Sequence, residues 1–272
     1  MMVLIGSGVY TGNTLGGIIG TYAYMNGGWA LTAPVIGAIN LLPLVFLALV
    51  DLPPAEVSYE KISPDGKYGV LKGLTAGQAV VFYLPDLAFF CNNISFSVLT
   101  YVVPYRMAEY LDKDLETIVF EMNIICCFSI FLGLGFALLT SARLDVFAVM
   151  IGSNVVFYAG CFLMYASTTD YCSFKYDFEL SALMVGFGDA TITNLLIMSK
   201  FVLFDKWKKD LAAVDLGQHA SEVFIVSDAL GYIVGTVAAG FTATRTSEKP
   251  TIVGILLYMC VTTVGLVVCK AV

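Results

Sequence analysis

Residues 6–17 read GSGVYTGNTLGG, which places five glycines within twelve residues of an otherwise apolar stretch. A glycine inside a helix costs up to about 1 kcal/mol relative to alanine, so this density requires a compensating gain. Gly8, Gly12 and Gly16 recur at intervals of four residues and share one face of a helix. Helices in a membrane associate through close van der Waals packing, which such a flat face permits. The stretch is therefore typical of a transmembrane helix that packs tightly against a neighbour.

The composition predicts an all-α integral membrane protein. Hydrophobic residues make up 58% of the chain and charged residues only 13%, with a mean hydropathy of +0.84. Apolar stretches recur along the whole length, which is typical of a multi-pass protein in a lipid bilayer. The net charge is −7, and many acids fall in short loops such as EYLDKDLE (109–116). We therefore expect no nucleic-acid partner.

The apolar stretches predict about eight transmembrane helices, since about 20 residues cross a bilayer. The expected spans are 2–24, 33–50, 77–104, 117–139, 146–166, 180–203, 220–243 and 251–270. The one long interruption, DLPPAEVSYEKISPDGKYGVLK (51–72), is rich in proline, glycine and charge and reads as a linker between two helix bundles. Lysine and arginine are more frequent on the side of this linker, which favours a cytoplasmic linker with both termini on the same side.

The glycine pattern of the first span returns in the seventh, where residues 231–240 read GYIVGTVAAG. The two spans are six apart and so cross the membrane in the same direction, as in a transporter with a parallel internal repeat. The corresponding positions are Gly8, Gly12, Asn13, Gly16 and Gly17 in the first span and Gly231, Gly235, Thr236, Ala239 and Gly240 in the seventh.

The stretch GVYTGNTLGG resembles the antiporter motif of the major facilitator superfamily, G-x-x-x-G-P-x-x-G-G, which that family carries on its fifth helix. Asn13 stands where the family has proline. The stretch GYIVGTVAAG corresponds to its eleventh helix. Within the superfamily, GFGDATITN (186–194) and LTYVVPYRM (99–107) resemble the tenth and seventh helices of the vesicular amine and polyamine transporters. The resemblance implies the major facilitator fold and a proton-coupled antiporter of organic cations.

By this resemblance the chain corresponds to helices five to twelve of a twelve-helix transporter. Residues 1–50 would be the last two helices of the N-terminal bundle, 51–76 the cytoplasmic linker between the bundles, and 77–272 the complete C-terminal six-helix bundle. The first four helices of the family are absent from the sequence. The missing helices or a partner chain are therefore expected to complete the protein.

Three acids inside the spans are candidates for proton coupling, because a carboxylate in the bilayer costs at least about 2.5 kcal/mol and usually faces a cavity or a partner. Asp189 lies mid-span with Thr193 one turn away, and we expect it to bind a proton and a cationic substrate in turn. A hydrogen-bonded structural aspartate is the alternative. Asp228 shares a helix face with Gly231 and Gly235 and is expected to supply a second acid, one turn beyond the family's position.

The third acid opens a polar stripe in the span 77–104. Its members fall on one side of a helix with 3.6 residues per turn. The stripe lines either a water-filled path or a hydrogen-bonded contact between helices. It consists of Asp86, Asn93, Ser97, Thr100 and Pro104.

The sequence carries no nucleophile–base pair, phosphate-binding loop or metal-ligand cluster, and it has one histidine. We therefore expect neither an enzyme nor a metal site nor a cofactor, with the proton as coupling ion. The predicted function is secondary active transport of small organic molecules, most specifically proton-coupled antiport of amines or polyamines, across an intracellular vesicle or plasma membrane. The alternative is a truncated membrane protein that transports nothing alone and acts as an interaction subunit.

Overall fold

The computed structural model describes residues 2–49, 74–111, 114–141, 143–167, 177–207, 213–245 and 248–272. Within these ranges the structure is all-helical, and most of the expected linker 51–76 lies outside them. The side chains of residues 2–14, which include Gly8, Gly12 and Asn13, also lie outside what is described. The helices are α1 (Met2–Leu49), α3 (Ala76–Leu111), α4 (Leu115–Ser141), α5 (Val146–Ala166), α6 (Asp177–Lys206), α7 (Ala213–Arg245) and α8 (Glu248–Ala271).

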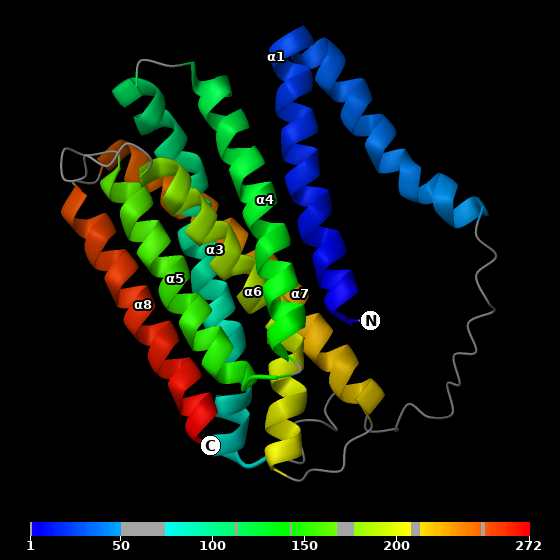
Figure 1. The fold of residues 1–272 in the computed structure, drawn as a ribbon, viewed down its shortest axis with the longest axis vertical. Coiled ribbons are helices and arrows are strands. Elements are labelled where there is room, and N and C mark those ends of the chain that lie inside the picture. The colour runs from blue at the N-terminus through cyan, green and yellow to red at the C-terminus, as the bar shows by residue number, and fades with distance from the viewer. Residues whose placement is uncertain are drawn as a thin grey trace.

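Six helices in the described part of the chain are long and apolar enough to cross a membrane, which identifies a multi-pass membrane protein. The apolar segments are Ala76–Ala108, Leu115–Ser141, Val146–Ala166, Asp177–Lys206, His219–Gly240 and Val253–Ala271. They coincide with the last six expected spans. The helices α3 to α8 run side by side as one bundle (Figure 1).

The first helix is bent. Gly28 adopts φ 55° and ψ −154°, a left-handed conformation that a side chain would disfavour, and it divides α1 into two arms. The first arm lies beside α4, and the second leads away from the bundle (Figure 1). The two helices expected over 2–24 and 33–50 are therefore joined by a hinge at one residue and not by a loop.

The starts of two helices are fixed by side chains that satisfy unbonded backbone N–H groups. Thr75 and Gln78 form a reciprocal capping box at the start of α3: each backbone N–H donates to the other's side-chain oxygen, at 3.1 and 3.3 Å. Asp145 caps α5 by accepting from the Ala148 N–H at 2.8 Å. The local sequence thus sets where these two spans begin.

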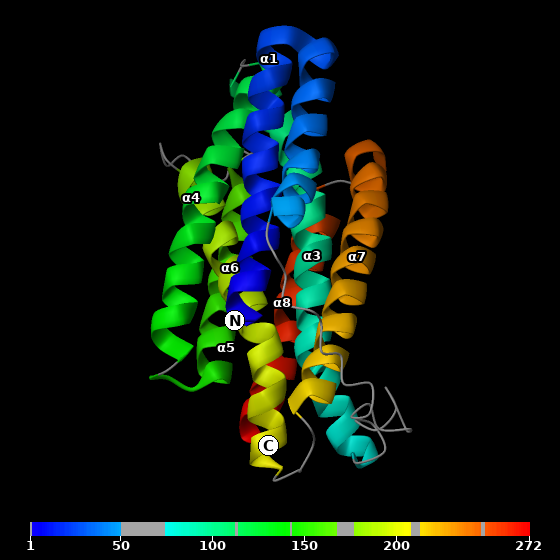
Figure 2. The same ribbon diagram turned by 90° about the vertical axis from the view of Figure 1, so that its right-hand side faces the viewer.

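The centre of the bundle is α6, which contacts α3, α4, α5 and α7 as well as α1 (Figure 2). Glycines allow its close approach to both main neighbours. A Cβ atom at Gly133 of α4 would lie 2.6 Å from the Phe187 carbonyl oxygen, and one at Gly188 would lie 2.7 Å from the Phe157 Cβ of α5. Small residues at such crossings are how membrane helices gain packing contact.

The packing of the six spans repeats itself. The main partners of α3 are α7 and α8, and the main partners of α6 are α4 and α5. If α3 is exchanged with α6, α4 with α7 and α5 with α8, the contact between α3 and α7 becomes the contact between α6 and α4. The contact between α3 and α8 likewise becomes the contact between α6 and α5. Because α3 and α6 are three spans apart, they cross the membrane in opposite directions. This is the arrangement of an inverted repeat of three helices plus three.

Candidate functional site

A buried ion pair joins α3 to α6. Lys200 Nζ donates to Asp86 Oδ2 and to the Phe82 carbonyl oxygen. The side chains are 1% and 5% exposed, respectively, so both charges are withdrawn from solvent. Within a bilayer such charges persist only when they are paired or face a polar cavity. Of the predicted site residues, Asp86 is therefore held by a lysine that the sequence interpretation did not assign to the site.

A proline inside α3 removes one backbone hydrogen bond close to the ion pair. Pro85 lacks the N–H that would bond to the carbonyl of Val81 one turn earlier, so that oxygen is left for another donor. The Cys269 thiol of α8 donates to it, with Sγ 3.5 Å from the oxygen. Phe82 supplies the next carbonyl along the chain, and this one accepts from Lys200. The helix interior thus offers backbone oxygens to side chains of two neighbouring helices.

Aromatic rings surround the ion pair. Lys200 Nζ lies 4.3 Å from the centroid of the Phe82 ring and 5.6 Å from that of Tyr83, which is within the range of cation–π attraction. His219 of α7 stacks on Phe82 at 6.0 Å, and its Nε2 lies 2.9 Å from the Tyr83 hydroxyl oxygen. The pair is therefore enclosed by residues of α3, α6 and α7.

The polar stripe of α3 lies against α7. Asn93 Nδ2 donates to Asp228 Oδ1 at 3.1 Å, and Asn93 is fully buried. A Cβ atom at Gly231 would lie 2.6 Å from Asn93 Cβ, and one at Gly235 would lie 2.6 Å from Ser97 Cβ. Asn93 and Ser97 thus stand in the contact between two helices, which is the geometry of the interhelical alternative.

Thr100 forms its side-chain hydrogen bonds within its own helix. Its hydroxyl donates to the Phe96 and Ser97 carbonyl oxygens of its own helix, at 2.7 and 3.1 Å. The Ser97 hydroxyl is buried and has no hydrogen-bond partner within the described residues. The stripe therefore divides into the ion pair at Asp86 and the seam around Asn93.

Asp189 lies at the centre of the bundle, where it is 1% exposed. It interacts electrostatically with Cys126 of α4, Cys161 of α5 and Tyr232 of α7. Thr193 lies one turn away, as expected, and its hydroxyl donates to the Asp189 backbone carbonyl at 2.9 Å.

The two remaining acids of the prediction, Asp189 of α6 and Asp228 of α7, both lie within electrostatic range of Tyr232. Asp228 is half-buried and bonded to Asn93. The structure thus bonds Asp228 to Asn93 and places both acids within electrostatic range of Tyr232. Two carboxylates and a tyrosine ring have the chemistry to hold an organic cation.

The glycine motifs contact different neighbours. A Cβ atom at Gly17 would lie 3.3 Å from Asn123 Nδ2 of α4, whereas one at Gly16 or Gly240 would meet no atom within 4 Å. Gly16 and Gly240 therefore differ from the expected tight packing. The reason is helix geometry, since successive residues point about 100° apart. Gly16 cannot share the face of Gly17, nor Gly240 that of Gly235.

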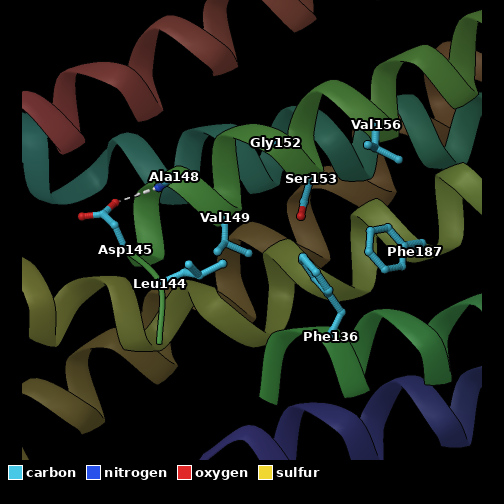
Figure 3. A pocket seen from close by; sticks show the side chains of 9 residues that line it. All are labelled: Phe136, Leu144, Asp145, Ala148, Val149, Gly152, Ser153, Val156 and Phe187. Atoms are coloured by element: carbon cyan, nitrogen blue, oxygen red, sulfur yellow. Dashed lines mark hydrogen bonds between the residues drawn. The ribbon is translucent and has the colours of Figure 1, made fainter. Parts of the chain in front are cut away.

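A pocket of about 550 Å³ opens between α4, α5 and α6. Figure 3 shows the aromatic side chains of Phe136 and Phe187 near Ser153, and Asp145 bonded to the Ala148 N–H at the start of α5. The lining is mostly apolar and includes none of the predicted site residues. Its lining residue Phe187 lies two positions before Asp189 on α6, but Asp189 itself does not line the pocket.

In the described part of the chain, no group of three His, Cys, Asp or Glu side chains is placed to hold a metal ion. No protein-family model, curated protein or solved structure matches the chain.

Proposed function

We propose that the protein is a secondary active transporter of the major facilitator type, which exchanges protons for small organic cations such as amines or polyamines. The observation that carries the proposal is that two acids stand inside a bundle of apolar spans: Asp189 is 1% exposed in α6, and Asp228 of α7 accepts a hydrogen bond from the buried Asn93. The repeating packing of three helices plus three supports it, because inverted repeats are typical of secondary transporters.

The chemistry follows from burial. A charged carboxylate inside the membrane is costly unless a cation or a proton neutralises it. Asp189 is therefore suited to bind either a proton or a substrate ammonium group. An ionised Asp189 with neither of them bound would be costly. Asp228 supplies a second acceptor across the site, and the Tyr232 ring offers a face to the cation. Loading one ligand then requires release of the other, which couples the two movements.

Uptake into liposomes tests the proposal. Purified protein is reconstituted into vesicles with an acidic interior, and the accumulation of radiolabelled amines and polyamines is measured. We expect accumulation that a protonophore abolishes and that Asp189→Asn eliminates. Asp145→Asn is the matched control: this exposed aspartate caps α5, and asparagine caps a helix equally well. Wild-type vesicles that accumulate no amine under a proton gradient would refute the proposal and favour a non-transporting subunit.

A further inference from the structure

The ion pair at Asp86 has the parts of a binding site for a cation. Two kinds of oxygen, the Asp86 carboxylate and the Phe82 carbonyl, converge on the Lys200 ammonium group. The rings of Phe82 and Tyr83 lie within 4.3 and 5.6 Å of the nitrogen. Oxygen ligands with aromatic walls are the common means of recognising an ammonium ion.

One oxygen of this site is unused. Asp86 is only 4% exposed, and its Oδ1 atom has no hydrogen-bond partner within the described residues. A buried acceptor without a donor is costly, so a residue that serves only as a structural clamp gains nothing from it. A carboxylate with spare acceptor capacity can instead receive a second donor during an exchange of cations. The arrangement is therefore better suited to a ligand than to a static bond.

The backbone of α3 supplies one of the two acceptors of the site, the Phe82 carbonyl oxygen. Pro85 removes the backbone donor to the Val81 carbonyl, so the hydrogen bonding of α3 is interrupted one residue away from Phe82. The neighbouring Val81 oxygen already accepts from Cys269, which shows that side chains reach this part of the helix. An ammonium group at this place is therefore held by a backbone oxygen of Phe82 and a side-chain oxygen of Asp86.

We propose that Asp86 and the Phe82 carbonyl form a binding site for a primary ammonium ion, and that the Lys200 side chain is its tethered resident ligand. An external primary amine of matching length takes the same place when Lys200 is removed. The site exists independently of transport. Its use as a step on the substrate path, where a cargo amine displaces Lys200 from Asp86, rests on the function proposed above.

Chemical rescue tests the site directly. Lys200→Ala removes three methylene groups and the ammonium group, which together correspond to n-propylammonium. Purified Lys200→Ala protein is heated with increasing n-propylammonium chloride, with sodium chloride at equal ionic strength and with 1-propanol. We expect a lowered melting temperature that n-propylammonium restores by at least half, saturably and in the millimolar range. Neither sodium chloride nor propanol, which has the same shape without the charge, should reproduce the effect.

Two variants separate the site from general salt effects. Lys206→Ala removes an exposed lysine from the end of the same helix and should show no response to the amine. Asp86→Asn combined with Lys200→Ala removes the carboxylate and should also abolish the rescue. A folded Lys200→Ala protein that responds to n-propylammonium no more than Lys206→Ala does would overturn the proposal.

If Lys200→Ala does not fold alone, the protein is expressed and purified with n-propylammonium or with propanol. Recovery of folded protein with the amine alone supports the site, and no recovery with the amine overturns it. The readout is stability, so it is independent of uptake. Rescue without amine uptake by wild-type vesicles would keep the ammonium site and remove the transport function, and uptake without rescue would do the reverse.

Discussion

The contact between α3 and α7 makes Gly235 the most sensitive glycine of the seventh expected span. A Cβ atom there would lie 2.6 Å from Ser97 Cβ, 2.9 Å from the Ile94 carbonyl oxygen and 3.0 Å from Ile94 Cα. Two of these three neighbours are backbone atoms, which cannot rotate away. Because carbon atoms pack at about 3.5–4.0 Å, Gly235→Ala requires the two helices to separate by about 1 Å.

The expected cost combines two opposing effects. Overpacking of this kind costs about 1–3 kcal/mol, while replacing glycine by alanine within a helix returns up to about 1 kcal/mol. The hydrogen bond from Asn93 Nδ2 to Asp228 Oδ1 is 3.1 Å long in the structure. The separation would lengthen it beyond the range of a hydrogen bond. We therefore expect Gly235→Ala to lower the free energy of unfolding by about 1–3 kcal/mol.

Equilibrium unfolding in mixed detergent micelles measures this difference. Gly240→Ala is the matched control, because it makes the same change on the same helix where the added methyl group meets no atom within 4 Å. It should leave stability unchanged or raise it by up to about 1 kcal/mol. If Gly235→Ala proves as stable as Gly240→Ala, then α3 and α7 do not approach each other as closely as the 2.6 Å contact at Ser97 requires.

Two further predictions concern polar contacts in the bundle. Lys200→Met should lower the unfolding free energy by about 3–5 kcal/mol, because it leaves Asp86 buried without its partner. Adding Asp86→Leu should restore most of the loss. A double-mutant cycle that shows no coupling between the two positions would contradict the ion pair. Asn154 of α5 donates to the Thr262 hydroxyl of α8 at 2.8 Å, so Asn154→Ala should cost about 1–2 kcal/mol in the same unfolding assay. The exposed Asn26→Ala should cost far less, and equal losses would rule out the interhelical bond as the cause.

Hydropathy predicted the last six of the eight expected spans well, because it measures the property that the bilayer selects. The span expected over 146–166 coincides with α5 (Val146–Ala166). The span expected over 77–104 is longer in the structure, where α3 continues to Leu111. Apolar content marks only the hydrocarbon thickness, and helices extend beyond it where the interface is polar. Between the spans expected over 2–24 and 33–50 the structure has a hinge at Gly28, which hydropathy cannot distinguish from a loop.

The partners of the polar residues were harder to predict. Helical periodicity placed Asp86 and Asn93 on one face, but it does not say which helix covers that face. The residues that bond to them, Lys200 and Asp228, are 114 and 135 positions further along the chain. One signal was available in the sequence: Lys200 is the one lysine or arginine lying more than two residues inside an expected span. A buried lysine requires an opposite charge, so Asp86 could have been proposed as its partner.

The glycine echo illustrates a different limit. The recurrence of the pattern in 231–240 correctly drew attention to Gly231 and Gly235, which touch α3 closely. The same pattern gave no information about the facing helix, and in the structure α1 contacts α4 and α6 whereas α7 contacts chiefly α3. Small residues permit close approach by any neighbour, so the spacing predicts a packing face and not a partner.

A buried carboxylate that holds either a proton or an organic cation must release its proton when the cation binds, and this release can be measured. Detergent-solubilised protein in weakly buffered solution is titrated with an amine that it binds, while the released protons are counted with a pH indicator. We expect the wild-type protein to release about one proton per cation bound. Asp189→Asn should release none, and Asp145→Asn should release as many as the wild type. Amine binding by the wild-type protein with no release of protons, or equal release by Asp189→Asn, would show that Asp189 does not exchange a proton for the cation.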